Sequence, residues 1–125
     1  MLDDVKLLNI ASAMVRHAAT RHTILAENIA NADTPDYKAR DLEEFSDAYA
    51  RMSNKFEQRS LGSGDDLPWR VEQTQITGSA SPNGNNVSLE EQMVRSADAQ
   101  QDHEAALAIY KKTIDLMRMT LGRNS

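Results

Sequence analysis

The sequence contains no cysteine, which excludes disulfide bonds and thiolate metal sites. Aromatic residues make up only 5% and apolar residues 40% of the chain, so any hydrophobic core must be thin. No stretch approaches the roughly 20 apolar residues that cross a bilayer, and the N-terminus lacks the basic segment and apolar run of a cleaved signal peptide. We therefore expect no direct membrane insertion, and any export must use another signal.

Charge of one sign is not concentrated on any part of the chain. The net charge is -5, with lysine and arginine scattered among aspartate and glutamate. Because no basic face is available to phosphates, we expect no nucleic-acid binding. A length of 125 residues predicts one structural unit.

Both ends of the chain carry a heptad repeat, in which the steps alternate between three and four residues. Residues 1–32 are predicted to form an N-terminal helix, whose repeat comprises Leu8, Ala11, Val15, Ala18, His22, Leu25 and Ile29. Residues 88–125 are predicted to form a C-terminal helix, whose repeat comprises Leu89, Met93, Ser96, Gln100, His103, Leu107, Tyr110, Ile114, Met117 and Leu121. Ser88 and Glu91 can form a capping box at its start, and Gly122 can close it.

The two repeats predict an antiparallel coiled coil, which we interpret as the assembly seam. A register with Leu8 facing Leu121 places small residues opposite large ones, and it puts Ile29 opposite Gln100. The seam is polar towards the middle of the chain, which predicts that other subunits complete it there. So few aromatic residues also predict that both ends become ordered only on assembly.

The segment between the two helices is predicted to be mainly irregular. Residues 33–58 should form a turn at Pro35 and then a short helix capped by Asp41. The apolar face of that helix comprises Leu42, Phe45, Tyr49, Met52 and Phe56. Residues 59–87 are rich in Gly, Ser and Asn and predict a flexible insert, within which residues 69–76 can form a short strand or hairpin. The fold class is therefore mainly α, with an irregular or weakly β insert.

No motif in the sequence indicates catalysis. His103 and Glu104 begin like the metal-binding helix of zinc proteases, but Leu107 stands where the second ligand must be. His17 and His22 lie on different faces of the first helix. No phosphate-binding loop or nucleophile turn is present. We therefore expect no enzyme, and no catalytic, cofactor-binding or metal site.

Two stretches resemble the bacterial flagellar rod and hook protein family. Residues 25–41, with the run Asp-Thr-Pro-Asp-Tyr-Lys-Ala-Arg-Asp at their end, resemble the N-terminal signature of that family in its proximal rod form. Residues 83–93 resemble the entry into its C-terminal helix. The resemblance implies a turn motif formed by Asn28, Asn31, Asp33, Thr34, Pro35 and Tyr37. Asp36 stands where the family often has glycine, which implies a turn of another type.

This resemblance implies a structural subunit of the periplasmic rod of the flagellar basal body. Such a subunit is exported by the flagellar type III apparatus without signal cleavage and assembles helically with copies of itself and other rod proteins. Its implied neighbours at the base are the adaptor FliE and the export gate, and no cofactor is implied. Two alternatives stay open: another short rod subunit of the family, and a cytoplasmic helical adaptor or secretion chaperone.

Overall fold

A computed structural model describes residues 2–58, 69–73 and 82–122 of the chain. In chain order, these residues form α1 (Leu2–Ala30), β1 (Arg40–Leu42), α2 (Phe45–Gln58), β2 (Val71–Gln73) and α3 (Leu89–Gly122). The chain divides into two compact units. The first contains α1 as far as Thr23 and α3 from Met93 onwards, and the second contains residues between Ile24 and Gln92.

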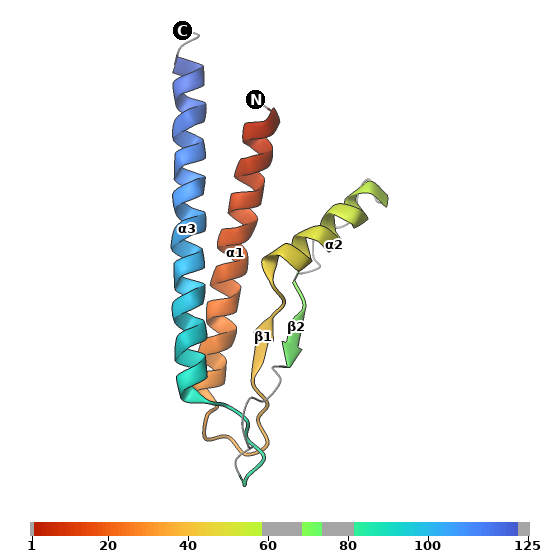
Figure 1. The fold of residues 1–125 in the computed structure, drawn as a ribbon, viewed down its shortest axis with the longest axis vertical. Helices are drawn as coiled ribbons and strands as arrows, with labels where there is room; N and C mark the ends of the chain where they lie inside the picture. The colour runs from red at the N-terminus through yellow and green to blue at the C-terminus, as the bar shows by residue number, and fades with distance from the viewer. Residues whose placement is uncertain (1, 59–68, 74–81, 123–125) are drawn as a thin grey trace. The chain divides into compact units, whose positions relative to one another are not determined.

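The first unit is an antiparallel pair of helices, which we call the helix pair (Figure 1). Acidic Asp3 and Asp4 lie in the first turn of α1, where their negative charges interact favourably with the positive end of the helix dipole. At the start of α3, Ser88 Oγ accepts a hydrogen bond of 3.4 Å from the Glu91 amide. The predicted fold class, mainly α with paired N- and C-terminal helices, is confirmed.

Small side chains form the buried strip between the two helices. Ala11 and Ala18 of α1 are buried, as are Ala99, Ala106 and Thr113 of α3. On each helix these residues recur every seven positions. Alanine at the contact allows helix axes to approach to the short end of the usual range, about 8 Å. The helix pair is therefore joined through small side chains and buries little apolar surface.

The second unit contains a two-stranded antiparallel sheet, in which Asp41 of β1 is level with Glu72 of β2. The sheet is extended by a 2.9 Å hydrogen bond from the Glu43 amide to the Arg70 carbonyl oxygen. Beside it, the ring of Phe45 lies 6.0 Å from that of Tyr49 and 6.4 Å from that of buried Trp69, measured between ring centroids. These rings supply apolar surface that two strands alone would lack.

An ion pair between Glu43, which directly follows β1, and Arg51 of α2 links this sheet to the helix. Both carboxylate oxygens of Glu43 accept hydrogen bonds from the Arg51 guanidinium, at 2.6 and 2.9 Å, and one also accepts the Arg70 amide at 2.8 Å. Burial acts to raise the pKa of the Glu43 carboxyl, but the hydrogen bonds from Arg51 and the Arg70 amide, with both positive charges, outweigh it. The pKa of Glu43 is therefore lowered.

The short helix begins later than predicted. Asp41 was expected to cap it, but Asp41 lies in β1 and its carboxylate accepts the Leu42 amide at 2.7 Å. The helix starts at Phe45 instead, because residues 40–42 pair with residues 71–73. The expected strand near Trp69 is present as β2. Of the predicted flexible insert, residues 59–68 and 74–81 lie outside the described residues, whereas residues 82–87 are described.

Candidate functional site

The predicted seam of α1 is buried along one strip. Ala11, Ala18 and Leu25 are fully or almost fully buried, and Leu8 and Val15 are half-buried. The remaining two members of the seam, His22 and Ile29, are exposed. The α1 seam thus contains both residues that contact α3 and residues that are available to other molecules.

The predicted seam of α3 divides in the same way. Its half-buried members are Ser96, His103, Leu107, Tyr110, Ile114 and Met117. Its exposed members are Gln100 and the apolar residues Leu89, Met93 and Leu121, whose exposed fractions are 51%, 66% and 56%. The most deeply buried positions of the helix pair on α3 are Ala99, Ala106 and Thr113, which sequence reasoning passed over. Their seven-residue spacing was the available signal.

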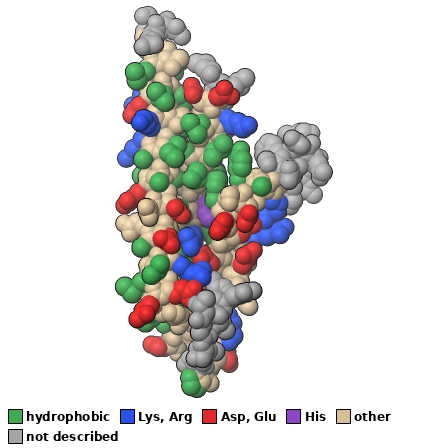
Figure 2. Space-filling view, viewed as in Figure 1, with side chains coloured by type: hydrophobic (Ala, Val, Ile, Leu, Met, Phe, Trp, Pro, Cys, Tyr) green, Lys and Arg blue, Asp and Glu red, His purple; other side chains and the backbone are tan. Residues whose placement is uncertain are grey.

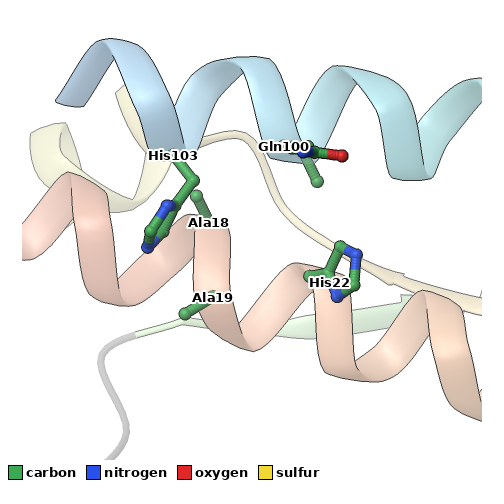
Figure 3. A pocket seen from close by; sticks show the side chains of 6 residues that line it. Ala18, Ala19, His22, Gln100 and His103 are labelled. Carbon is green, nitrogen blue, oxygen red and sulfur yellow. The ribbon is translucent and has the colours of Figure 1, made fainter. Parts of the chain in front are cut away.

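A hollow of about 290 Å³ lies between the two helices of the pair. It is lined by Ala18, Ala19 and His22 of α1 and by Ala99, Gln100 and His103 of α3. Figure 3 shows the imidazole of His103 reaching from α3 towards Ala18 and Ala19. The small side chains of the alanines leave this space open.

The predicted register of the two helices is wrong by about one heptad. The sequence placed Ile29 opposite Gln100, yet the neighbouring Asn28 donates a hydrogen bond of 2.9 Å to Gln92, which lies eight positions before Gln100. The predicted register paired large residues with small ones. The structure instead places alanines on both sides of the strip, and a buried amide pair fixes the offset.

The hollow contains no catalytic or metal-binding arrangement. His22 and His103 line it, but among residues 2–58, 69–73 and 82–122 no three His, Asp or Glu side chains come together in a way that could hold a metal ion. Two imidazoles without a carboxylate partner do not complete a nucleophile or acid–base set. The feature of the helix pair that remains to be described is its outer surface.

The outer surface of the helix pair carries large apolar side chains among charged ones, as Figure 2 shows for one face. On α1 these are Val5 and Leu7. On α3 they are Val94, Ile109, Leu116, Met119 and the exposed seam residues Met93 and Leu121. Leu116 and Met119 are 49% and 61% exposed. In the described part of the chain no helix is long and apolar enough to span a bilayer.

The second unit contains a buried network of side-chain amides, which we call the amide latch. It joins Asn28 and the turn at residues 31–40 to the segment at residues 83–92 that leads into α3 (Figure 1). No buried side-chain nitrogen or oxygen among the described residues lacks a hydrogen-bond partner. Satisfied networks of this kind rigidify a structure and fix one arrangement.

Asn28 is the centre of the latch and is fully buried. Its Nδ2 donates to the Arg40 carbonyl oxygen at 2.6 Å and to Gln92 Oε1 at 2.9 Å. Its Oδ1 accepts the Arg40 amide at 3.0 Å and the Tyr37 hydroxyl at 3.2 Å. One side-chain amide thereby pairs with both backbone groups of Arg40, as a neighbouring strand would.

Asn85 and Asn86 form the other side of the latch. Buried Asn85 donates through Nδ2 to the carbonyl oxygens of Asn31 and Thr34, at 2.8 and 2.7 Å. Asn86 Oδ1 accepts the Ala39 amide at 2.6 Å, and the Asn86 amide donates to the Tyr37 carbonyl oxygen at 3.2 Å. The turn is therefore held mainly by side chains that lie about 50 positions later in the sequence.

The residues of the predicted turn motif do not all lie in the latch. Asn28, Asn31, Thr34 and Tyr37 all make hydrogen bonds within it. Asp33 and Pro35 are exposed. Asn85, Asn86 and Gln92 were not named as site residues, although the Asn-rich run at residues 83–86 was the signal for two of them.

Two left-handed residues complete the turn. Asp36 has a φ of 62°, in the region that glycine favours and that aspartate tolerates better than most residues. Gly84 has a φ of 84°, and a Cβ built there would overlap the Asp36 carboxylate. The Asp36 amide donates to the Asn83 carbonyl oxygen at 3.0 Å, and the Lys38 ammonium group donates to that of Gly84. Asp36 thus adopts a backbone conformation that glycine favours, although the sequence resemblance implied a turn of another type at this position.

No protein-family model matches the sequence. A curated relative does: the flagellar basal body rod protein FlgB of Agrobacterium fabrum is 23% identical over 135 aligned residues, which take in 98% of this chain and 97% of the relative. The chain is FlgB-like. The similarity to FlgB covers both the helix pair and the amide latch, because it extends over nearly the whole of each chain.

Proposed function

We propose that this protein is a structural subunit of the rod of the bacterial flagellar basal body. The observation that carries the proposal is the similarity to FlgB over nearly the full length of both chains. The helix pair supports it independently, because large apolar side chains such as Leu116 and Met119 are left outside the thin seam. A surface of this kind is suited to contacts between subunits.

We further propose that assembly is helical and runs through the two terminal helices. Contacts between different faces of identical subunits generate helical arrays when their rotation does not close into a ring. The helix pair can form such contacts, because its exposed apolar residues occur on both α1 and α3. The partners are then copies of this chain and other rod proteins.

The finer parts of the proposal concern location. We place the subunit in the proximal part of the periplasmic rod, next to the adaptor FliE and the export gate. We also propose export by the flagellar type III system without cleavage of a signal peptide. The resemblance of residues 25–41 to the proximal form of the family motif supports this position.

Two other functions make different predictions. Another short rod subunit would be recovered in basal bodies but would not restore rods to a strain that lacks FlgB. A cytoplasmic adaptor or secretion chaperone would remain in the cytoplasm as a folded oligomer. Expression in a strain without FlgB therefore separates all three.

The test uses that strain, with the full-length chain or a variant expressed in it. Leu116→Glu places a charge on the outer surface of α3, while Gln101→Glu makes a matched change at an exposed polar position of the same helix. We expect intact, unprocessed chain in detergent-resistant basal bodies for the parent and for Gln101→Glu, and at least about tenfold less for Leu116→Glu, since burying one unpaired charge costs more than 1.4 kcal/mol.

Three results would contradict the proposal. The first is absence of the parent chain from basal bodies while cytoplasmic levels are normal. The second is a chain that is present but shortened at its N-terminus, which would contradict export without cleavage. Equal recovery of Leu116→Glu and Gln101→Glu would remove the role of the outer surface of α3.

A further inference from the structure

The latch contains a chemically labile side-chain amide at an exposed position. Asn83 is exposed and is followed by Gly84. Glycine has no Cβ, so its backbone nitrogen is unhindered towards the side-chain carbonyl carbon of the preceding asparagine. No other asparagine in the sequence is followed directly by glycine.

We propose that Asn83 is a site of spontaneous deamidation, that the closed latch protects it, and that its product prevents the latch from closing. The proposal does not depend on the proposed function, because it concerns the chemistry of the chain alone. It assigns to Asn83 and Gly84 a modification that changes the state of the latch.

The reaction requires only water. The Gly84 nitrogen loses its proton to solvent and forms a bond to Cγ of Asn83. The bond from Cγ to Nδ2 breaks, and Nδ2 leaves with a solvent proton as ammonia. Water then opens the resulting cyclic succinimide at one of its two carbonyl groups. The products are aspartate, or an isoaspartyl linkage in which the backbone passes through the former side chain; neither step is an oxidation or a reduction.

The closed latch holds both reacting residues in place. The Asn83 carbonyl oxygen accepts the Asp36 amide at 3.0 Å, and Asn83 Oδ1 accepts the Asn85 amide at 3.1 Å. The carbonyl oxygen of Gly84 accepts the Lys38 ammonium group. Ring closure changes the backbone of Asn83 and Gly84, so these hydrogen bonds must open first. The rate of deamidation therefore depends on how often the latch is open.

The isoaspartyl product does not fit the closed latch. It lengthens the backbone by one carbon where Gly84 and Asp36 are already so close that a Cβ on Gly84 would overlap the Asp36 carboxylate. Both products also add a negative charge to the turn that contains Asp36. The modification thus marks chains whose latch has stayed open and keeps it open.

The test follows amide loss by peptide mass spectrometry on the purified full-length chain, at mildly alkaline pH, in buffer and in urea. In urea we expect Asn83 to deamidate before Asn31, Asn85 and Asn86, which do not precede glycine. In buffer we expect its rate to fall about tenfold or more, since two hydrogen bonds of Asn83 must open together. Asn85→Ala, which removes a central bond of the latch, should bring the rate in buffer close to that in urea.

Hydrogen exchange on protein that has been incubated until part of it is deamidated tests whether the product keeps the latch open. The amides of Asp36 and Asn86 are protected by the latch and should lose protection in the isoaspartyl fraction. Asn83→Gln, whose longer side chain slows ring closure, should keep protection after the same incubation. Equal rates for Asn83 in buffer and urea, earlier loss at Asn31, or full protection in the isoaspartyl fraction would each overturn the proposal.

Discussion

A single asparagine connects three segments that are distant in the sequence. Asn28 extends from α1, bonds both backbone groups of Arg40 and reaches Gln92 near the start of α3. All four of its hydrogen-bonding positions are used, and none is exposed. Only a side-chain amide fits here, because its NH2 group can donate two hydrogen bonds on one side while its oxygen accepts two on the other.

Asn28→Asp tests this requirement at nearly constant shape. The new oxygen would face the Arg40 carbonyl and Gln92 Oε1, both acceptors, and would carry a buried negative charge. We expect a loss of about 2–4 kcal/mol in the free energy of unfolding, measured by urea denaturation at unchanged slope. The control is Asn9→Asp, at an exposed position of the same helix. Equal stability of the two variants would show that Asn28 is not held as described.

Glu43 predicts how stability depends on pH. Its pKa is lowered in the folded chain, so its contribution is present above the unfolded pKa of about 4.3 and is lost as the pH falls through the lower folded value. Glu43→Gln should lower the free energy of unfolding by about 1–2 kcal/mol at neutral pH. It should also make that free energy fall less steeply as the pH is lowered. Urea unfolding from pH 7 to pH 3 measures it. Glu44→Gln, at the exposed neighbour, is the control and should keep the parent's acid loss.

At the scale of elements, the helices themselves were predictable and their offset was not. The heptad steps, Ser88, and Pro35 after the first helix marked the end of α1 and the start of α3 to within two residues of the structure. The register depended on which residues count as the seam. Ala99 and Ala106 resemble surface alanines in the sequence, because nothing local distinguishes a close helix contact from an exposed site.

Charge offered a signal for the register that hydrophobicity did not. The structure places Ala18 and His103 at one hollow, and counting along the two helices from this pair matches acidic Asp3 with basic Arg118 in the sequence. The predicted register would have placed acidic Asp3 beyond Leu121. Pairing unlike charges along two antiparallel helices is favourable, although each exposed pair contributes only about 0.2–1 kcal/mol.

A disulfide crosslink distinguishes the two registers. The chain has no cysteine of its own, so Ala18→Cys with His103→Cys should form a disulfide under mild oxidation, because both positions line the same hollow. Ala18→Cys with Tyr110→Cys, the pair expected from the sequence register, should not. Mobility on a non-reducing gel reports the bond. Preferential crosslinking of the second pair would restore the original register.

At the scale of the whole molecule, local patterns predicted the class of fold and long-range polar contacts escaped prediction. The turn at Pro35 and the extended segment after it follow from residues next to one another. The latch does not, because Asn85 and Asn86 act on residues about 50 positions earlier. The pairing of β1 with β2 was likewise not predicted, because an alternation of apolar and polar residues cannot be recognised over only three residues.

The alanine strip of the helix pair has a consequence for errors in folding. Because a small side chain recurs every seven positions on α3, at Ala99, Ala106 and Thr113, a slip of one heptad would again place small side chains against α1. Such a slip would, however, separate Asn28 from Gln92 and break the hydrogen bond between their buried side chains. Mispaired chains are thus penalised at one pair of residues, and the fidelity of alignment in this protein rests on an amide bridge more than on its hydrophobic contacts.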